Sequence, residues 1–148
     1  MEIGQQTNLQ FINVGFPTVQ FYSKRPLETA DASSYPINAN IDANVYFPPE
    51  DKQLFSIVMN IRISSTNIFD LTLVAVGAFR HEDGIAEELK KSFINVNAPA
   101  IVFPYVRSFV SLLTSNLGFI LPHVLLPTQF FKGELTEIKV LGQSNNPQ

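Results

Sequence analysis

Three segments in the first half of the chain alternate between apolar and polar side chains with a period of two. This period is typical of a β-strand with one buried face. The apolar positions are Tyr35, Ile37, Ala39, Ile41, Ala43, Val45 and Phe47, then Phe55, Ile57, Met59, Ile61 and Ile63, then Phe69, Leu71, Leu73, Ala75, Gly77 and Phe79. Val74 and Val76 make the second face of the last segment apolar too, which predicts a strand that is central or covered on both sides.

An earlier strand, from about Leu9 to Ser23, is less regular. Gly15-Phe16-Pro17 interrupts its alternation, and because proline cannot donate to a ladder, we predict an edge strand with a bulge there. The links at 48–51 and 65–67 are short enough to join only antiparallel neighbours. The expected fold is α+β, with four antiparallel strands and a long crossover loop over residues 24–34.

A long helix is predicted from Asn97 to Gly118, with Asn97 as N-cap, Pro99 in the first turn and a bend at Pro104. Its apolar positions do not fit on one stripe: Ile101, Phe103, Tyr105, Val106, Phe109, Val110, Leu112, Leu113 and Leu117. A helix that is apolar nearly all round is buried on more than one side, which suggests a second subunit.

Arg107, Ser111 and Thr114 form the narrow polar strip of this helix. We expect the polar strip to lie at a helix-to-helix contact in a homo-oligomer, a dimer of dimers. The alternative is a monomer in which the strip faces water.

The flanking segments are less regular. Residues 86–91 are expected to form a short helix, and residues 119–131 are apolar and interrupted by prolines. Residues 133–140 alternate as a strand would. Residues 142–148 read as a disordered tail, so residues 1–148 are expected to form one domain.

Composition and charge exclude several classes of function. Only 16% of residues are charged, the net charge is −3 and no basic run occurs, which argues against nucleic-acid binding. The chain has no cysteine, so disulfides and thiolate chemistry are excluded. The first residues lack a signal-peptide pattern and apolar runs are short, so a cytoplasmic protein without membrane insertion is expected.

No arrangement of side chains suggests catalysis. His81 precedes Glu82 and Asp83 in what reads as a solvated turn, and His123 is expected to be hydrogen-bonded or exposed in a loop. No glycine-rich phosphate loop or nucleophile elbow is present. We therefore expect no catalytic residues, no cofactor and no metal, and a binding protein rather than an enzyme.

The segment Asn97-Ala98-Pro99-Ala100-Ile101-Val102-Phe103-Pro104-Tyr105-Val106-Arg107 resembles the SecB family signature, as do Ser111, Leu113 and Thr114 downstream. The proline-framed run Pro122–Phe130 and the strand Phe69–Phe79 are also similar to that family. The resemblance implies a four-stranded antiparallel sheet with a long helix, oligomers, and apolar grooves that hold unfolded clients without nucleotide. It therefore implies a holdase chaperone for precursor proteins.

The chain departs from the family pattern where members present acidic side chains to the SecA motor. Thr72 and the region Phe16–Tyr22 are not acidic, and residues 143–148 carry no charged side chain. We expect weak or no binding to SecA. The alternatives are a SecB-like chaperone of an antitoxin, or a β-sheet module that carries a small apolar ligand.

Candidate client-binding residues are the apolar side chains near the irregular first strand and after the long helix. They are Phe16, Val19, Phe21, Tyr22, Phe119, Leu121, Leu125, Leu126, Phe130 and Phe131.

Overall fold

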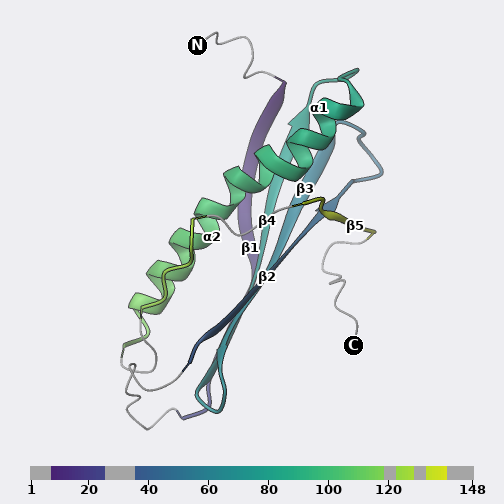
Figure 1. The fold of residues 1–148 in the computed structure, drawn as a ribbon. Helices are drawn as coiled ribbons and strands as arrows, with labels where there is room; N and C mark the ends of the chain where they lie inside the picture. The colour runs from purple at the N-terminus through teal and green to yellow at the C-terminus, as the bar shows by residue number, and fades with distance from the viewer. Residues whose placement is uncertain (1–7, 26–35, 119–122, 129–132, 140–148) are drawn as a thin grey trace.

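A computed structural model describes residues 8–25, 36–118, 123–128 and 133–139. One helical rod lies across one face of a twisted sheet (Figure 1). The strands are β1 (Leu9–Ser23), β2 (Asn38–Tyr46), β3 (Leu54–Ser65), β4 (Phe69–His81) and β5 (Thr136–Ile138). The helices are α1 (Glu87–Ser92), the π-helical turn η2 (Phe93–Asn97) and α2 (Ala98–Ser115).

The sheet has five strands in the order β1-β4-β3-β2-β5. The prediction of four antiparallel strands is wrong on this point, because β5 pairs in parallel with β2, Asn44 to Thr136 and Tyr46 to Ile138. Only three residues of the strand-like segment 133–140 are in β5. The pairing of β5 with β2 could not be predicted, because parallel neighbours are joined by a long connection and not by a short turn. Here that connection includes the whole helical rod.

Strand β1 is the irregular edge strand that was predicted. Its register against β4 shifts twice, between Phe11 and Asn13 and between Gly15 and Thr18. Phe16 and Pro17 together lie opposite one β4 residue, since Gly15 pairs with Val76 and Thr18 with Val74. Pro17 has no N–H to donate, so the bulge falls where the ladder would lose a bond in any case.

Strand β4 is central, between β1 and β3, as predicted. Its odd-numbered residues face the helix and are buried, whereas Val74 and Val76 on the other face are only half-buried. Within the subunit, the helix therefore covers one face of β4.

The helix is longer than the sequence indicated. Asn97 has helical dihedral angles and no capping hydrogen bond from its side chain, so its prediction as N-cap is wrong. The π turn instead joins α1 to α2 without a break. Val102, Val106 and Val110 are fully buried against the sheet. Gly77 gives Val102 room, because a Cβ at residue 77 would overlap the Val102 side chain.

By length and composition, the helical stretch Glu87–Ser115 is apolar enough to cross a membrane. The same property is common in the core helix of a domain, and α2 contributes seven buried residues here. Its packing against the sheet accounts for part of its hydrophobicity.

Candidate functional site

An apolar hollow lies beside the β1 bulge. Its volume is about 640 Å3, and its lining comes from Asn13, Gly15, Phe16, Pro17 and Thr18 of β1 with Val74 and Val76 of β4. Gly15 leaves this space open, since a Cβ there would meet no atom within 4 Å. The hollow lies where the register of β1 against β4 shifts between Gly15 and Thr18.

The predicted client residues on β1 differ in exposure. Tyr22 is 67% exposed and Val19 is 43% exposed. Phe16 and Phe21 are half-buried, because Phe16 stacks on Phe109 with 4.4 Å between ring centroids and Phe21 contacts Phe69. Ile12 at the first register shift is 43% exposed and was missed, although its place in an irregular edge strand was a usable signal.

The candidates after the helix separate in a similar way. Leu125 is 60% exposed, whereas Leu126 is 3% exposed and belongs to the hydrophobic core. Because its side chain is buried in its own subunit, Leu126 offers no apolar surface to a client in this conformation. Phe119, Leu121, Phe130 and Phe131 lie outside the described residues.

The polar strip of α2 is occupied by the chain itself. Residues 123–128, here named the strap, run along it. Arg107 Nε donates to the Leu126 carbonyl at 2.7 Å, and Thr114 Oγ1 accepts from the Val124 N–H at 2.9 Å. A hydrogen bond of 2.6 Å joins Ser111 Oγ and His123 Nε2. The strip therefore faces the strap within the subunit, and its place at a helix-to-helix contact between subunits stays a prediction.

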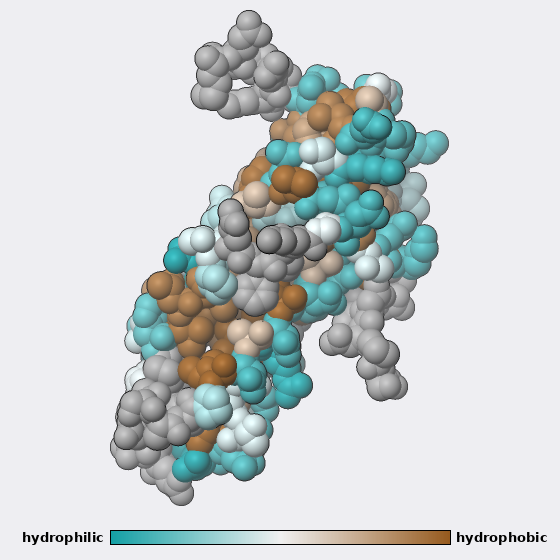
Figure 2. All heavy atoms as spheres, in the orientation of Figure 1, coloured by the Kyte–Doolittle hydropathy of each residue, from teal (hydrophilic) through white to brown (hydrophobic). Residues whose placement is uncertain are grey.

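The exposed side of α2 is apolar instead. Leu112 is 64% exposed and Tyr105 is 46% exposed, and they are seven positions apart, so they lie on one side of the helix. Figure 2 shows apolar surface gathered over the C-terminal half of α2. Ser108 is also exposed between Tyr105 and Leu112, so this side presents two large apolar side chains around a serine, a surface that a partner helix can cover.

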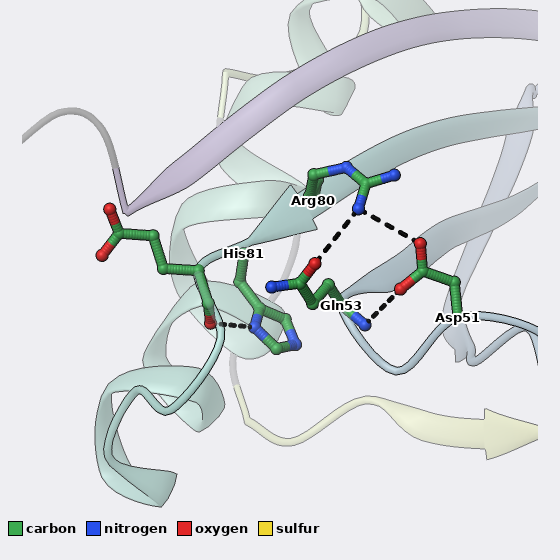
Figure 3. A network of polar contacts seen from close by, with 5 residues as sticks. Asp51, Gln53, Arg80 and His81 are labelled. Carbon is green, nitrogen blue, oxygen red and sulfur yellow. Dashed lines mark hydrogen bonds and ion pairs between the residues drawn. The ribbon is translucent and has the colours of Figure 1, made fainter.

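A polar network holds the strand ends at the opposite end of the sheet (Figure 3). Arg80 Nη1 donates to Asp51 Oδ2 at 3.1 Å and to Gln53 Oε1 at 3.3 Å. The Gln53 backbone N–H donates to Asp51 Oδ1, and this bond is the main reason that the pKa of Asp51 lies below its usual range; the hydrogen bond and charge of Arg80 lower it further. The network fixes the turn before β3 against the end of β4.

His81 beside this network is buried, at 7% exposed, so the expectation of a solvated turn is wrong for it. Its Nδ1 donates to the Glu82 carbonyl at 2.8 Å, and its ring is stacked with the Phe55 ring at 6.3 Å between centroids. His123 is exposed in the strap, as expected. Among the described residues, no group of three His, Cys, Asp or Glu side chains could hold a metal ion.

Charges on the open face of the sheet are largely compensated. Asp70 lies between Arg62 at 3.1 Å and Lys24 at 3.2 Å. Hydrogen bonds from Arg62 and then Lys24 lower the pKa of the Asp70 carboxyl. The Asp70 carboxylate is therefore paired with two cations.

Comparisons with known proteins agree with this architecture. Residues 23–132 match the family described as preprotein translocase subunit SecB. The chain belongs to the SecB family.

A protein-export protein SecB from Orientia tsutsugamushi (strain Boryong) is 33% identical over 117 residues, 76% of this chain and 68% of that protein. One from Anaplasma phagocytophilum (strain HZ) is 28% identical over 123 residues, 76% of this chain and 75% of its own length. Among solved structures, the SecB-like chaperone Rv1957 of Mycobacterium tuberculosis was determined with a ChAD peptide from the HigA1 antitoxin. It superposes with a TM-score of 0.63 at 15% identity, over 86% of this chain and 91% of that one.

Membership of the SecB family supports a chaperone role for the chain. The signature residues that carried the sequence resemblance also acquire a structural meaning. Arg107, Ser111 and Thr114 hold the strap onto α2.

Proposed function

We propose that this protein is a holdase that binds unfolded polypeptides, including export precursors, and keeps them from aggregating without using nucleotide. The observation that carries the proposal is the exposed apolar surface at the β1 bulge, in a chain of a chaperone family. Unfolded chains present apolar side chains of many shapes, so their receptor needs open apolar surface rather than a closed pocket.

The proposed client surface is built from the β1 side chains and the strap. Tyr22, Val19 and Ile12 are exposed along β1, and the hollow beside Pro17 can take an apolar side chain. Phe16 lines the hollow and also stacks on Phe109 of α2. Phe21 contacts Phe69 on the helix side of the sheet, and Leu125 on the strap adds exposed apolar surface on that side. Leu126 contributes only when the strap leaves α2.

We further propose a cytoplasmic homo-oligomer that joins subunits through the exposed side of α2. Leu112 and Tyr105, the large exposed apolar side chains of α2, form this proposed contact. A paired helix would cover the apolar surface that one sheet leaves uncovered, which gives a reason for the hydrophobicity of α2 all round.

The compensated charges on the open sheet face support a client-holding role that does not depend on SecA. An antitoxin is then a second candidate client. The Mycobacterium tuberculosis chaperone was solved with an antitoxin peptide, and its fold matches that of this chain. A third candidate, a carrier of a small apolar ligand, draws on the 640 Å3 hollow, whose volume is in the range of ligand sites.

An aggregation assay tests the proposal. The purified protein is added, without nucleotide, to a chemically denatured client as it is diluted, and light scattering is followed. A holdase suppresses scattering at near-stoichiometric amounts, and Tyr22→Ser weakens the suppression. Unchanged client aggregation, together with a small apolar molecule copurifying in native mass spectrometry, would identify a ligand carrier instead.

A further inference from the structure

We infer that the polar strip of α2 is a binding site for the main chain of an extended client segment. In the structure, strap residues 123–126 occupy this site, here named the seat, and compete with the client for it. The inference deepens the proposed function and rests on it. The client is recognised through its main chain, and the strap limits its access to the strip.

The strip contacts the strap mainly through backbone atoms. Thr114 Oγ1 accepts from the Val124 N–H, and Arg107 Nε donates to the Leu126 carbonyl. Thr114 is 1% exposed and its hydroxyl donates to the Val110 carbonyl at 2.8 Å, so the hydroxyl is fixed as an acceptor for the strap. Every residue except proline offers the N–H and carbonyl that these two side chains bind.

The strap has the burial pattern of an extended peptide. Val124 is half-buried, Leu125 is 60% exposed and Leu126 is 3% exposed, so inward and outward side chains alternate. In an extended chain, residues two apart repeat the same orientation, so the bonded N–H and carbonyl both face α2. A client therefore needs only an extended stretch with an apolar side chain in the place of Leu126, which unfolded proteins offer at many points.

Three hydrogen bonds and one buried side chain hold the strap in this seat. Residues 123–127 belong to no helix or strand, and Pro127 has no N–H with which to continue the contact. Leu126 is its one fully buried side chain among the described residues 123–128. A competitor that fills the seat most of the time lowers the apparent affinity for clients by the fraction of molecules in which the seat is free.

A proline substitution in the strap tests the competition without altering the strip. Val124→Pro removes the backbone N–H that donates a hydrogen bond to Thr114 Oγ1. The probe is fluorescein-labelled, reduced and carboxymethylated α-lactalbumin, which stays unfolded, and its dissociation constant is measured by fluorescence anisotropy. We expect Val124→Pro to lower this constant by about threefold or more, because the free seat becomes more populated. Thr128→Ala, at an exposed strap position, should leave it unchanged.

Locking the strap gives the opposite arm of the test. Because the chain has no cysteine, Ser111→Cys combined with His123→Cys places its only two thiols at the observed contact. A short bismaleimide then ties the strap to α2, and the same protein before reaction is the reference. We expect crosslinking to raise the dissociation constant by about tenfold or more.

Circular dichroism establishes that each variant is folded, and if Val124→Pro does not fold, the crosslinked pair decides alone. Equal affinity before and after crosslinking, with the wild-type protein binding the probe, would overturn this inference and leave the holdase proposal standing. A wild-type protein that does not bind the probe at all would overturn both.

Discussion

Asp70 shows how a single charged residue changes meaning between sequence and structure. On the predicted strand it reads as an exposed acid available to a basic partner. In the structure its carboxylate lies against Arg62 and Lys24, which lower its pKa. Its ion pairs stabilise the tip of the β3–β4 hairpin, and the two cations offset the negative potential that a basic partner would need.

The Asp70 ion pairs predict a specific pH dependence. A carboxyl whose pKa is lower in the folded state stabilises the fold above its unfolded pKa of about 3.9, and this contribution is lost as the pH falls through the folded pKa. We expect Asp70→Asn to lower the melting temperature at pH 7, with the difference from wild type shrinking below about pH 4. Asp83→Asn, at an exposed turn, is the control. A difference that stays constant down to pH 2 would contradict the ion-pair account.

The packing of α2 on the sheet depends on Gly77 at the scale of elements. A Cβ at this position would overlap the Val102 side chain, which is fully buried. We expect Gly77→Ala to reduce the free energy of unfolding by about 1–3 kcal/mol, measured by urea denaturation.

Gly15→Ala is the matched control for Gly77→Ala, because the added methyl group meets no atom within 4 Å. Its effect should stay within about 0.5 kcal/mol. Equal destabilisation by the two substitutions would mean that the close approach of α2 to β4 is not what Gly77 provides.

Most elements could be predicted from sequence because their signals are local. The period-two alternation located β2, β3 and β4, and Pro17 marked the bulge in β1. The position of β5 could not be predicted, because three residues carry little pattern and its pairing with β2 is set by distant contacts. One of these is the bond from the Leu135 N–H to Asn95 Oδ1, on the π turn.

The candidate site was predicted in composition but not in arrangement. An apolar residue in an irregular strand can face inward or outward, so the exposure of Val19 and Tyr22 could not be told from that of Phe21. The polar strip was found from sequence, yet its partner was not. Thr114 and Arg107 form hydrogen bonds with backbone atoms of the strap. Nearly every residue type has the same backbone atoms, so the sequence does not show where such a bond is formed.

The exposed side of α2 carries the prediction about assembly of the whole molecule. We expect Leu112→Glu to shift the protein to a smaller species in sedimentation velocity at micromolar concentration, because a carboxylate at the centre of an apolar interface is desolvated without a partner. Thr66→Glu, on the exposed β3–β4 turn, should leave assembly unchanged. A wild-type protein that is already monomeric would contradict this interface.

The distribution of charge over the whole molecule predicts weak or no binding to SecA. Complementary potentials steer protein association, and this chain has a net charge of −3 with Asp70 already paired. A titration with purified SecA at low salt should give no saturable binding at micromolar concentrations. Micromolar or tighter affinity that is lost in Asp70→Asn would show that acidic docking operates after all.

The most direct test of the holdase account compares two states of one client. Isothermal titration is carried out with a polypeptide in its permanently unfolded form and, separately, in its native form. We predict saturable binding of the unfolded form, with a negative heat-capacity change from burial of apolar surface, and no binding of the native form. Equal binding of both forms, or binding of neither, would contradict the claim that this protein recognises unfolded chains.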